Sequence, residues 1–454
     1  MNDPVNQIRS ALPGIAWPAV PGQEAAATLA LQFQLERSQW LTPERLRELQ
    51  FRQLDVLVRH AHDSVRYYRE RWEGRYDSGR LLTPEVFSRI PVLARSELQA
   101  NFDALKSNRI PPDHGQVAES RTSGSTGAPV RVLKTGLVQL MWQAIVLREH
   151  QWFQRDFGGK LAAIRQGATD GEGEGWGPAT DGVYRTGRSA TLNIRADVDT
   201  QLWWLQAQEP DYLLTYPSNV AELARTSMAL RAPIPRLREV RTFGEILAPE
   251  TRELCREAWG VPVTDAYSSD EAGYMALQCP ENEHYHAQAE NVLVEVLDER
   301  GNPCAPGGTG RVIVTALHNF AMPLVRYELG DYAEVGSLCG CGRGLPVLAR
   351  IVGRARNMLV AADGKRYWPT FGSAGLARLA PVLRQQLVQK TVGTIEVRLV
   401  TARPLAPEEE TRLRGHILTK LPAPFEIRFS YHDSLPRSAG GKFEDFVCEV
   451  PATE

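Results

Sequence analysis

Apolar residues recur at helical spacing near the start of the chain. Between Leu31 and Arg71 they fall at intervals of three and four, which predicts helix: Leu46, Leu49, Phe51, Leu54, Leu57 and Val58. The pairs Thr42-Pro43 and Thr83-Pro84 are typical of an N-cap followed by the first helical residue. We therefore expect a helical portion over residues 31–110.

Further along, short apolar runs alternate with amphipathic stretches. We predict strands over 161–164, 212–215, 241–243 and 263–267, and helices over 137–153, 202–208, 219–230 and 249–258. Strand and helix in turn indicate a parallel sheet with helices on its faces. Ligands of such sheets bind at the carboxyl ends of the strands. The predicted mouth of the site is therefore formed by Tyr216, Gly244, Glu245 and Ser268 to Glu271.

From Val292 the pattern changes to β, with strands expected over 292–297 and 311–315 in an antiparallel or barrel-like section. The end of the chain alternates again, as strand 395–399, helix 407–418 and strand 425–429. We predict an α/β protein with two domains. The large N-terminal domain, 1–352, has mostly parallel sheets, helices and a β-barrel-like section. The small, mobile α+β domain, 353–454, follows a polar hinge at Gly353–Asn357.

Composition narrows the class of protein. The 52 basic and 54 acidic residues give a net charge of −2, which favours neither nucleic acid nor a membrane surface as a partner. No run approaches the ~18 apolar residues of a membrane span, and Met1–Pro21 lacks the apolar core of a signal peptide. We expect a cytoplasmic protein whose six cysteines are not a disulfide framework. The oligomeric state stays open, a homodimer included.

The stretch Ser123–Gly127 consists only of hydroxyl-bearing residues and glycine. Such a loop can fold its backbone N–H groups around an anion, although Gly/Ser runs also serve as flexible linkers. Pro129 and a predicted strand over 130–133 follow at once. A tight phosphate-binding loop between ordered elements fits better than a tether. The glycine-rich run 171–177 carries glutamates, which would repel phosphate, and we interpret it as a mobile active-site or surface loop.

Carboxylates and a lysine occur at three further places. Tyr267–Glu271 ends a strand with two acidic groups, which suits Mg²⁺ or a helix cap. Arg326–Asp331 places a carboxylate after a glycine, where it either accepts ribose hydroxyls or stabilises a turn. Lys442 follows the flexible run 438–441 and is either a surface lysine or a point charge for a phosphate or carboxylate.

Five residues are candidate metal ligands: Cys279, His284, His286, Cys339 and Cys341. Three thiolates and one imidazole would complete a four-coordinate structural zinc site. The spacing Cys-x-Cys is not the usual Cys-x-x-Cys, so reduced bystander cysteines remain the alternative.

The order of these motifs resembles the adenylate-forming superfamily, and within it the phenylacetate–CoA ligase and capsular-polysaccharide CapK-like branch. The resemblance runs from about residue 40 to the end of the chain. It rests on the phosphate loop 122–129, Tyr267–Glu271, Arg326–Asp331, Gly353-Arg354 and Gly441-Lys442, with Val65–Arg69 and Cys339–Pro346 pointing to the branch.

The resemblance implies a set of roles. Ser123, Gly124, Ser125, Thr126 and Gly127 would hold the phosphates of ATP, and Glu271 would bind Mg²⁺. Asp331 would bind the ribose hydroxyls beside Arg354. The adenine would lie between the Gly244-Glu245 segment and the Ala266, Tyr267 and Ser268 segment. Lys442 would bridge the substrate carboxylate and the α-phosphate. Structural Zn²⁺ would be held by Cys279, His286, Cys339 and Cys341, with His286 preferred over His284.

The implied reaction is ATP-dependent activation of a carboxylic acid, aryl or arylacetic, followed by transfer to a thiol. Coenzyme A is the first choice of acceptor, ahead of a carrier-protein thiol and an amine. A catalytically degenerate nucleotide-binding relative is the rival class. Aromatic residues that could line the acid pocket, or belong to the core, are Trp142, Tyr184, Tyr216, Pro217 and Phe243, with Arg148 and His150 as polar candidates. Ala128 departs from the lysine of many relatives, and Arg356 and Asn357 depart from the branch's hinge.

Overall fold

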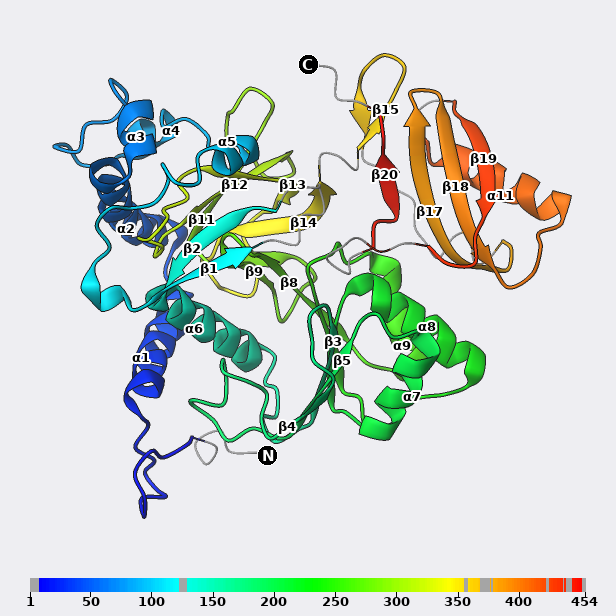
Figure 1. Cartoon of the computed structure of the whole chain (residues 1–454), viewed down its shortest axis with the longest axis horizontal. Coiled ribbons are helices and arrows are strands. Elements are labelled where there is room, and N and C mark those ends of the chain that lie inside the picture. Colours follow the sequence, from blue (N-terminus) through cyan, green and yellow to red (C-terminus); the bar gives the residue numbers. More distant parts are fainter. Residues whose placement is uncertain are drawn as a thin grey trace.

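Twelve strands form one continuous mixed sheet in the computed structural model (Figure 1). Their order is β11-β12-β13-β14-β10-β9-β8-β7-β6-β3-β5-β4. The structure describes residues 8–121, 129–354, 358–367, 376, 379–421, 424–435, 437 and 443–450. The predicted phosphate loop, Ser123–Gly127, and Lys442 lie outside the described residues.

One half of the sheet is parallel. It contains β3 (Leu161–Arg165), β5 (Ser189–Asn193), β6 (Tyr212–Thr215), β7 (Glu239–Phe243) and β8 (Val263–Ser269). The connecting helices are α7 (Val198–Gln208), α8 (Pro217–Leu230) and α9 (Pro249–Trp259). Successive side chains of a strand point to opposite faces. Val240 accordingly joins the apolar cluster with these helices, whereas its neighbour Arg241 pairs with Glu149 of helix α6 (Gly136–Trp152).

The other half is antiparallel, so the expectation of mostly parallel sheets is wrong. Its strands are β9 (Gly273–Gln278), β10 (Tyr285–Ala287), β11 (Val292–Leu297), β12 (Thr309–Ala316), β13 (Tyr327–Val335) and β14 (Val347–Arg354). The predicted barrel-like section is continuous with the parallel strands. At the far edge, β4 (Gly171–Gly173) pairs with β5, so part of the expected 171–177 loop is an edge strand.

The helices of the N-terminal part of the chain cover the antiparallel half of the sheet. They are α1 (Gln23–Ser38), α2 (Pro43–Ser64), α3 (Arg66–Arg71), α4 (Pro84–Ser88) and α5 (Arg95–Ala100), with the 3₁₀ turn η2 (Pro112–His114). The side chain of Thr42 accepts the backbone N–H of Arg45, and Thr83 caps α4 in the same way. The predicted helical stretch 31–71 is therefore interrupted where Thr42 caps a new helix.

Two further strands flank the predicted phosphate loop. Strand β1 (Val117–Arg121) pairs antiparallel with β2 (Arg131–Thr135), and Arg121 lies opposite Arg131. Residues 122–128, between these two paired strands, lie outside the described residues, so the prediction of a tight loop there stays a prediction. Helix α6 begins directly after β2 and packs on α1.

The C-terminal unit, residues 359–450 as described, has its own sheet, in the order β19-β18-β17-β20. It contains β15 (Leu359–Val360), β16 (Arg366–Tyr367), β17 (Val382–Thr391), β18 (Thr394–Thr401), α11 (Pro407–Thr419), β19 (Glu426–Tyr431) and β20 (Phe446–Cys448). All described members of its apolar core come from residues 359–448. In Figure 1 the unit lies at the upper right, above α8 and α9.

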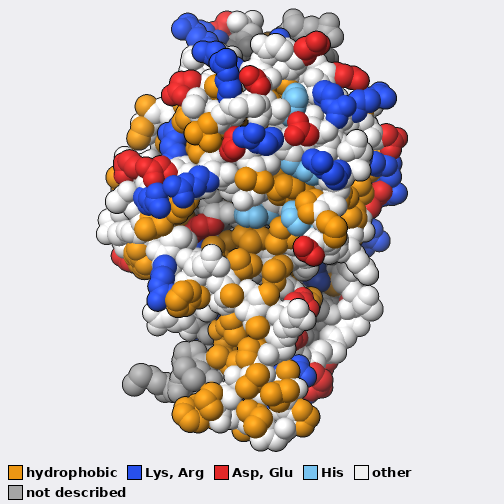
Figure 2. Space-filling view, turned by 90° about the vertical axis from the view of Figure 1, so that its left-hand side faces the viewer, with side chains coloured by type: hydrophobic (Ala, Val, Ile, Leu, Met, Phe, Trp, Pro, Cys, Tyr) orange, Lys and Arg blue, Asp and Glu red, His pale blue; other side chains and the backbone are white. Residues whose placement is uncertain are grey.

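Exposed apolar side chains gather at the lower end of the face shown in Figure 2, where Figure 1 places the segment ahead of α1. The large apolar side chains exposed in this segment are Leu12, Ile15, Trp17 and Val20. None of the helices in the described part of the chain combines the length and apolar character that crossing a membrane requires.

Candidate active site

The carboxyl ends of the central parallel strands β6, β7 and β8 lie side by side, and we call this end of the strands the carboxyl edge. Thr215 pairs with Thr242, and Phe243 pairs with Ala266, so the residues that follow these strands share that edge. This arrangement brings together the residues expected there: Tyr216, Pro217, Phe243, Gly244, Glu245, Ala266, Tyr267 and Ser268. Gly244 has φ +77°, a conformation that glycine adopts readily.

Tyr267 reaches across this edge to the antiparallel half. Its hydroxyl donates a 2.8 Å hydrogen bond to Oδ2 of Asp331 on β13. Arg354 lies opposite Asp331 in the register of β13 and β14, and its Nε donates to Oδ1 at 3.2 Å. Burial, with Asp331 nearby, holds the pKa of Tyr267 well above its usual value. Asp331 lies within a strand and binds partners from two other strands, which contradicts the turn-stabilising interpretation.

Glu271 is a buried carboxylate held by a cation that sequence reasoning missed. Its Oε1 accepts from Nη1 of Arg95 at 3.1 Å and from the hydroxyl of Tyr327 at 3.4 Å. Nε of Arg95 is buried and has no hydrogen-bond partner among the described residues. Strand β9 follows Glu271, so the helix-cap interpretation of 267–271 is wrong.

Lys134 on β2 adds a second positive charge near Glu271. Burial lowers the pKa of Lys134, and the carboxylates of Asp270 and Glu271 act in the opposite direction. Lys134 pairs with Ala118, at the end of the β1–β2 hairpin away from residues 122–128. Neither Arg95 nor Lys134 carried a recognisable motif, because both belong to elements distant in sequence from Glu271.

Glu245 connects two parts of the site. Its Oε2 accepts the backbone N–H of Ser218 at the start of α8 at 2.9 Å, and Oε1 accepts the N–H of Phe443 at 2.7 Å. Burial raises the pKa of Glu245, and the two backbone donors oppose that rise. Phe443 directly follows Lys442 in the chain.

The aromatic candidates do not form one group. The rings of Tyr216 and Phe243 are 5.0 Å apart at the mouth. Tyr184 stacks on Phe157, 4.5 Å away, in another apolar cluster that also contains Ala25 and Leu147. Trp142 is half-buried on α6. The structure therefore does not bring Tyr184 to the mouth.

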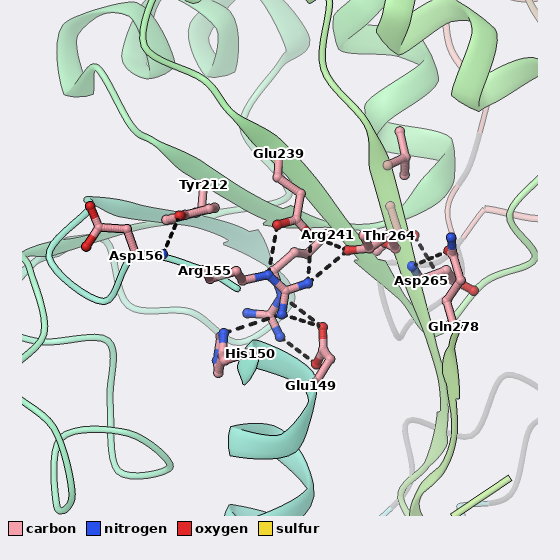
Figure 3. A network of polar contacts seen from close by, with 12 residues as sticks. Glu149, His150, Arg155, Asp156, Tyr212, Glu239, Arg241, Thr264, Asp265 and Gln278 are labelled. Atoms are coloured by element: carbon pink, nitrogen blue, oxygen red, sulfur yellow. Dashed lines mark hydrogen bonds and ion pairs between the residues drawn. The ribbon is translucent and has the colours of Figure 1, made fainter. Parts of the chain in front are cut away.

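Arg148 and His150 do not face a substrate pocket, contrary to expectation. Arg148 is buried and pairs with Glu290 at 2.8 Å. His150 packs beside a network of buried charges on α6, β7 and β8 (Figure 3). In that network Arg155 binds Glu239 at 2.6 Å. Burial and the neighbouring arginines lower the pKa of His150 well below its usual value. This network fixes α6 against the sheet.

The cysteine and histidine candidates converge at one end of β10. The ligand atoms of Cys279, His284, His286 and Cys339 all lie within 4.8 Å of one another. Sγ of Cys341 lies 3.4 Å from Nε2 of His286. Nδ1 of His286 and Nε2 of His284 are buried without hydrogen-bond partners among the described residues. Burial lowers the pKa of His286 to about 4, so its ring is neutral, as a metal ligand requires.

The surroundings of these sulfur atoms also suit a metal. The side-chain amide of Asn282 lies 3.5 Å from Sγ of Cys339 and 3.6 Å from Sγ of Cys279. The backbone N–H of Glu281 donates to Cys279 at 3.4 Å. Such donors stabilise thiolates and orient them. A structural zinc takes four ligands, and the four grouped atoms include His284, whereas Cys341 of the expected set lies outside that group and approaches His286.

Comparison with known proteins finds similarity to acid–coenzyme A ligases over most of the chain. It is 26% identical over 378 residues to the phenylacetate–coenzyme A ligase of Thermus thermophilus, covering 78% of this chain and 81% of that protein. It is 25% identical over 341 residues to the same ligase of Pseudomonas putida, covering 72% and 74%. A crystal structure of 2-hydroxyisobutyryl-CoA ligase in the postadenylation state superposes with a TM-score of 0.72 at 17% identity, covering 92% of both chains. No family model matches.

Proposed function

Because the chain belongs to the adenylate-forming superfamily, with distant phenylacetate–CoA ligase homologues across most of its length, we propose that it is an acid–CoA ligase that forms AMP. It uses ATP to convert a carboxylic acid into an acyl adenylate with release of pyrophosphate. The acyl group then passes to the thiol of coenzyme A. The acid that we propose is an aryl or arylacetic acid.

The observation that carries this proposal is the meeting of Tyr267, Asp331 and Arg354 at the carboxyl edge of the sheet. Asp331 would accept the ribose hydroxyls of ATP, and Arg354 and the phenol of Tyr267 fix its carboxylate. The face of Tyr267 and the Gly244-Glu245 segment would enclose the adenine from two strands. Placement of this kind lowers the barrier by orientation.

Charge neutralisation accounts for the rest of the first step. An oxygen of the substrate carboxylate attacks the α-phosphorus of ATP, and pyrophosphate leaves. Glu271 would hold Mg²⁺, which neutralises phosphate oxygens. Ser123–Gly127 would donate backbone N–H groups to the phosphates, and Lys442 would bridge the carboxylate and the α-phosphate. Tyr216, Pro217 and Phe243 would provide apolar surface for the ring of the acid.

For the second step, we propose that the C-terminal unit turns about residues 353–357 and admits the thiol. The thiolate attacks the acyl carbon of the adenylate, the C–S bond forms, and AMP leaves with the C–O bond electrons. The domain boundary would then lie near residue 353. Cys279, His286, Cys339 and Cys341 would hold zinc, and four protein ligands would give it a structural role because they leave no open position.

An acid-dependent pyrophosphate-exchange screen tests the proposal. The panel covers benzoates, arylacetates, heteroaryl acids and amino acids, with Lys442→Ala as the inactive control. We expect exchange with at least one aryl acid and a thioester product when coenzyme A is added. Exchange without a thioester would favour a carrier-protein or amine acceptor, and no exchange with any acid would contradict the proposed activity.

A further inference from the structure

A carboxylate on α8 binds two arginines of the C-terminal unit. Oε2 of Glu222 lies 3.4 Å from Nη2 of Arg384 on β17, and 3.4 Å from Nη2 of Arg437. Nη1 of Arg437 also donates to Oγ of Ser218, one turn earlier on α8, at 3.1 Å. The three charged side chains are between 17% and 20% exposed, so the cluster is largely shielded from solvent.

Phe443, six residues after Arg437, is linked to the same end of α8 through Glu245. Ser218 gives its backbone N–H to Glu245, and the other oxygen of Glu245 accepts the N–H of Phe443. The guanidinium of Arg384 lies over the ring of Phe443, 4.9 Å from its centroid. The described residues on both sides of 438–442 thus contact the part of the chain that carries the large sheet: Arg437 contacts α8, and Phe443 contacts Glu245, which follows β7.

This attachment is polar. The apolar core of the C-terminal unit draws all its described members from residues 359–448 and none from the large sheet. Interfaces between domains that lack a shared apolar core separate readily. Ion pairs of partly exposed groups contribute little each and weaken with salt. Such contacts fit a docked position that forms and is released in each catalytic cycle.

We propose that Glu222, Arg384 and Arg437 are positioning residues that dock the segment carrying Lys442 for the first half-reaction only. The inference rests on the proposed function, since it assigns these ion pairs to one of its two steps. Glu222 touches no substrate in this assignment. It acts through Arg437 and Arg384, which hold the residues around Lys442 beside the Gly244-Glu245 segment.

The test compares the two half-reactions in Glu222→Gln and Arg437→Gln. We expect acid-dependent pyrophosphate exchange to fall about tenfold, the effect of losing ~1.4 kcal/mol of positioning. Thioester formation from preformed acyl adenylate and coenzyme A should stay within about twofold of wild type, because the dock is released in that step. The matched control is Arg398→Gln, which breaks a 3.1 Å pair with Glu396 inside the C-terminal sheet at 23% exposure. It should leave both half-reactions unchanged. An equal fall in both half-reactions, or no fall in the first, would overturn the proposal.

Hydrogen–deuterium exchange gives a readout that does not depend on catalysis. In the apo protein, Glu222→Gln should speed exchange in peptides covering residues 437–445 and the first turn of α8, and leave β18 protected. Unchanged exchange at 437–445 would overturn the dock even if no acid proves to be a substrate. Absence of pyrophosphate exchange in wild type, with faster deuterium uptake in the variant, would refute the proposed activity alone.

Discussion

The hydroxyl of Tyr267 donates to Asp331 across the junction between the parallel and antiparallel halves of the large sheet. Tyr267 directly follows the last parallel pair, Phe243 with Ala266, on β8, and Asp331 belongs to β13, four places along the sheet order. The bond therefore joins two strands that are not neighbours. Since the pKa of Tyr267 is raised by burial and by Asp331, the phenol stays protonated and remains a donor throughout the neutral range.

Removing that hydroxyl should weaken ATP binding more than it weakens the fold. Tyr267→Phe keeps the ring that we propose to lie against the adenine but frees Asp331 to rotate. We expect the KM for ATP to rise about fivefold to tenfold, the effect of losing about 1 to 1.4 kcal/mol, which is within the range of one typical hydrogen bond. Tyr332→Phe is the matched control, since Tyr332 also donates to a carboxylate, Glu299, at 2.9 Å and lies beside Asp331. A similar rise in both variants would contradict the role given to Tyr267.

The partner of Glu271 makes a second prediction. Arg95→Gln leaves a buried carboxylate without its cation, which should lower the free energy of unfolding by about 2 kcal/mol without ligand. Mg²⁺ with ATP would then replace the missing charge, so these ligands should raise the melting temperature of Arg95→Gln more than that of wild type. Calorimetry with and without MgATP measures both effects.

Arg71→Gln is the control for that experiment. Arg71 pairs with Glu97 at 2.6 Å in the same group of N-terminal helices, and both side chains are more exposed than Glu271. We expect a smaller loss of stability, under about 1 kcal/mol, and the ligand shift of wild type. An equal ligand shift in the Arg95 and Arg71 variants would exclude Glu271 as the magnesium ligand.

The metal cluster allows a test of which histidine is the ligand. We expect about one equivalent of zinc in protein purified without chelator, and its loss in Cys339→Ser and His286→Gln. His284→Gln should retain the metal, because the proposed set is completed by Cys341. Cys304→Ser is the control, because Cys304 is a free cysteine outside the cluster. Loss of zinc in His284→Gln with retention in His286→Gln would reverse the assignment.

The sequence predicted the parts of the site that depend on periodicity. Strand β6 was expected at 212–215 and found there, and the placement of Tyr216 and Glu245 at one edge followed from parallel strands. It could not predict contacts made by side chains from remote elements. Arg95 precedes Glu271 by 176 residues, and nothing in its own helix marks it. Residue type alone also does not show whether an aromatic side chain lines a pocket or packs in the core. Tyr184 packs in a core cluster.

A buried aspartate beneath the site should make stability depend on pH. Asp265 on β8 accepts from Thr242 at 2.6 Å and from the hydroxyl of Tyr285 at 2.7 Å, and burial raises its pKa to about 6. The folded protein therefore holds this proton at a pH where the unfolded chain has released it. Stability contributed by the protonated form is lost as the pH rises from about 4 to about 6, by a few kcal/mol at most.

Asp265→Asn removes that dependence because an amide does not titrate. Urea titration gives the unfolding free energy of wild type minus that of Asp265→Asn. This difference should fall between pH 4 and pH 7 and stay constant above pH 7. Asp298→Asn is the control: Asp298 is exposed, and backbone N–H donors lower its pKa, so its contribution changes with pH in the opposite direction. A wild-type minus Asp265→Asn difference that is flat over this range would show that the folded pKa of Asp265 is not raised.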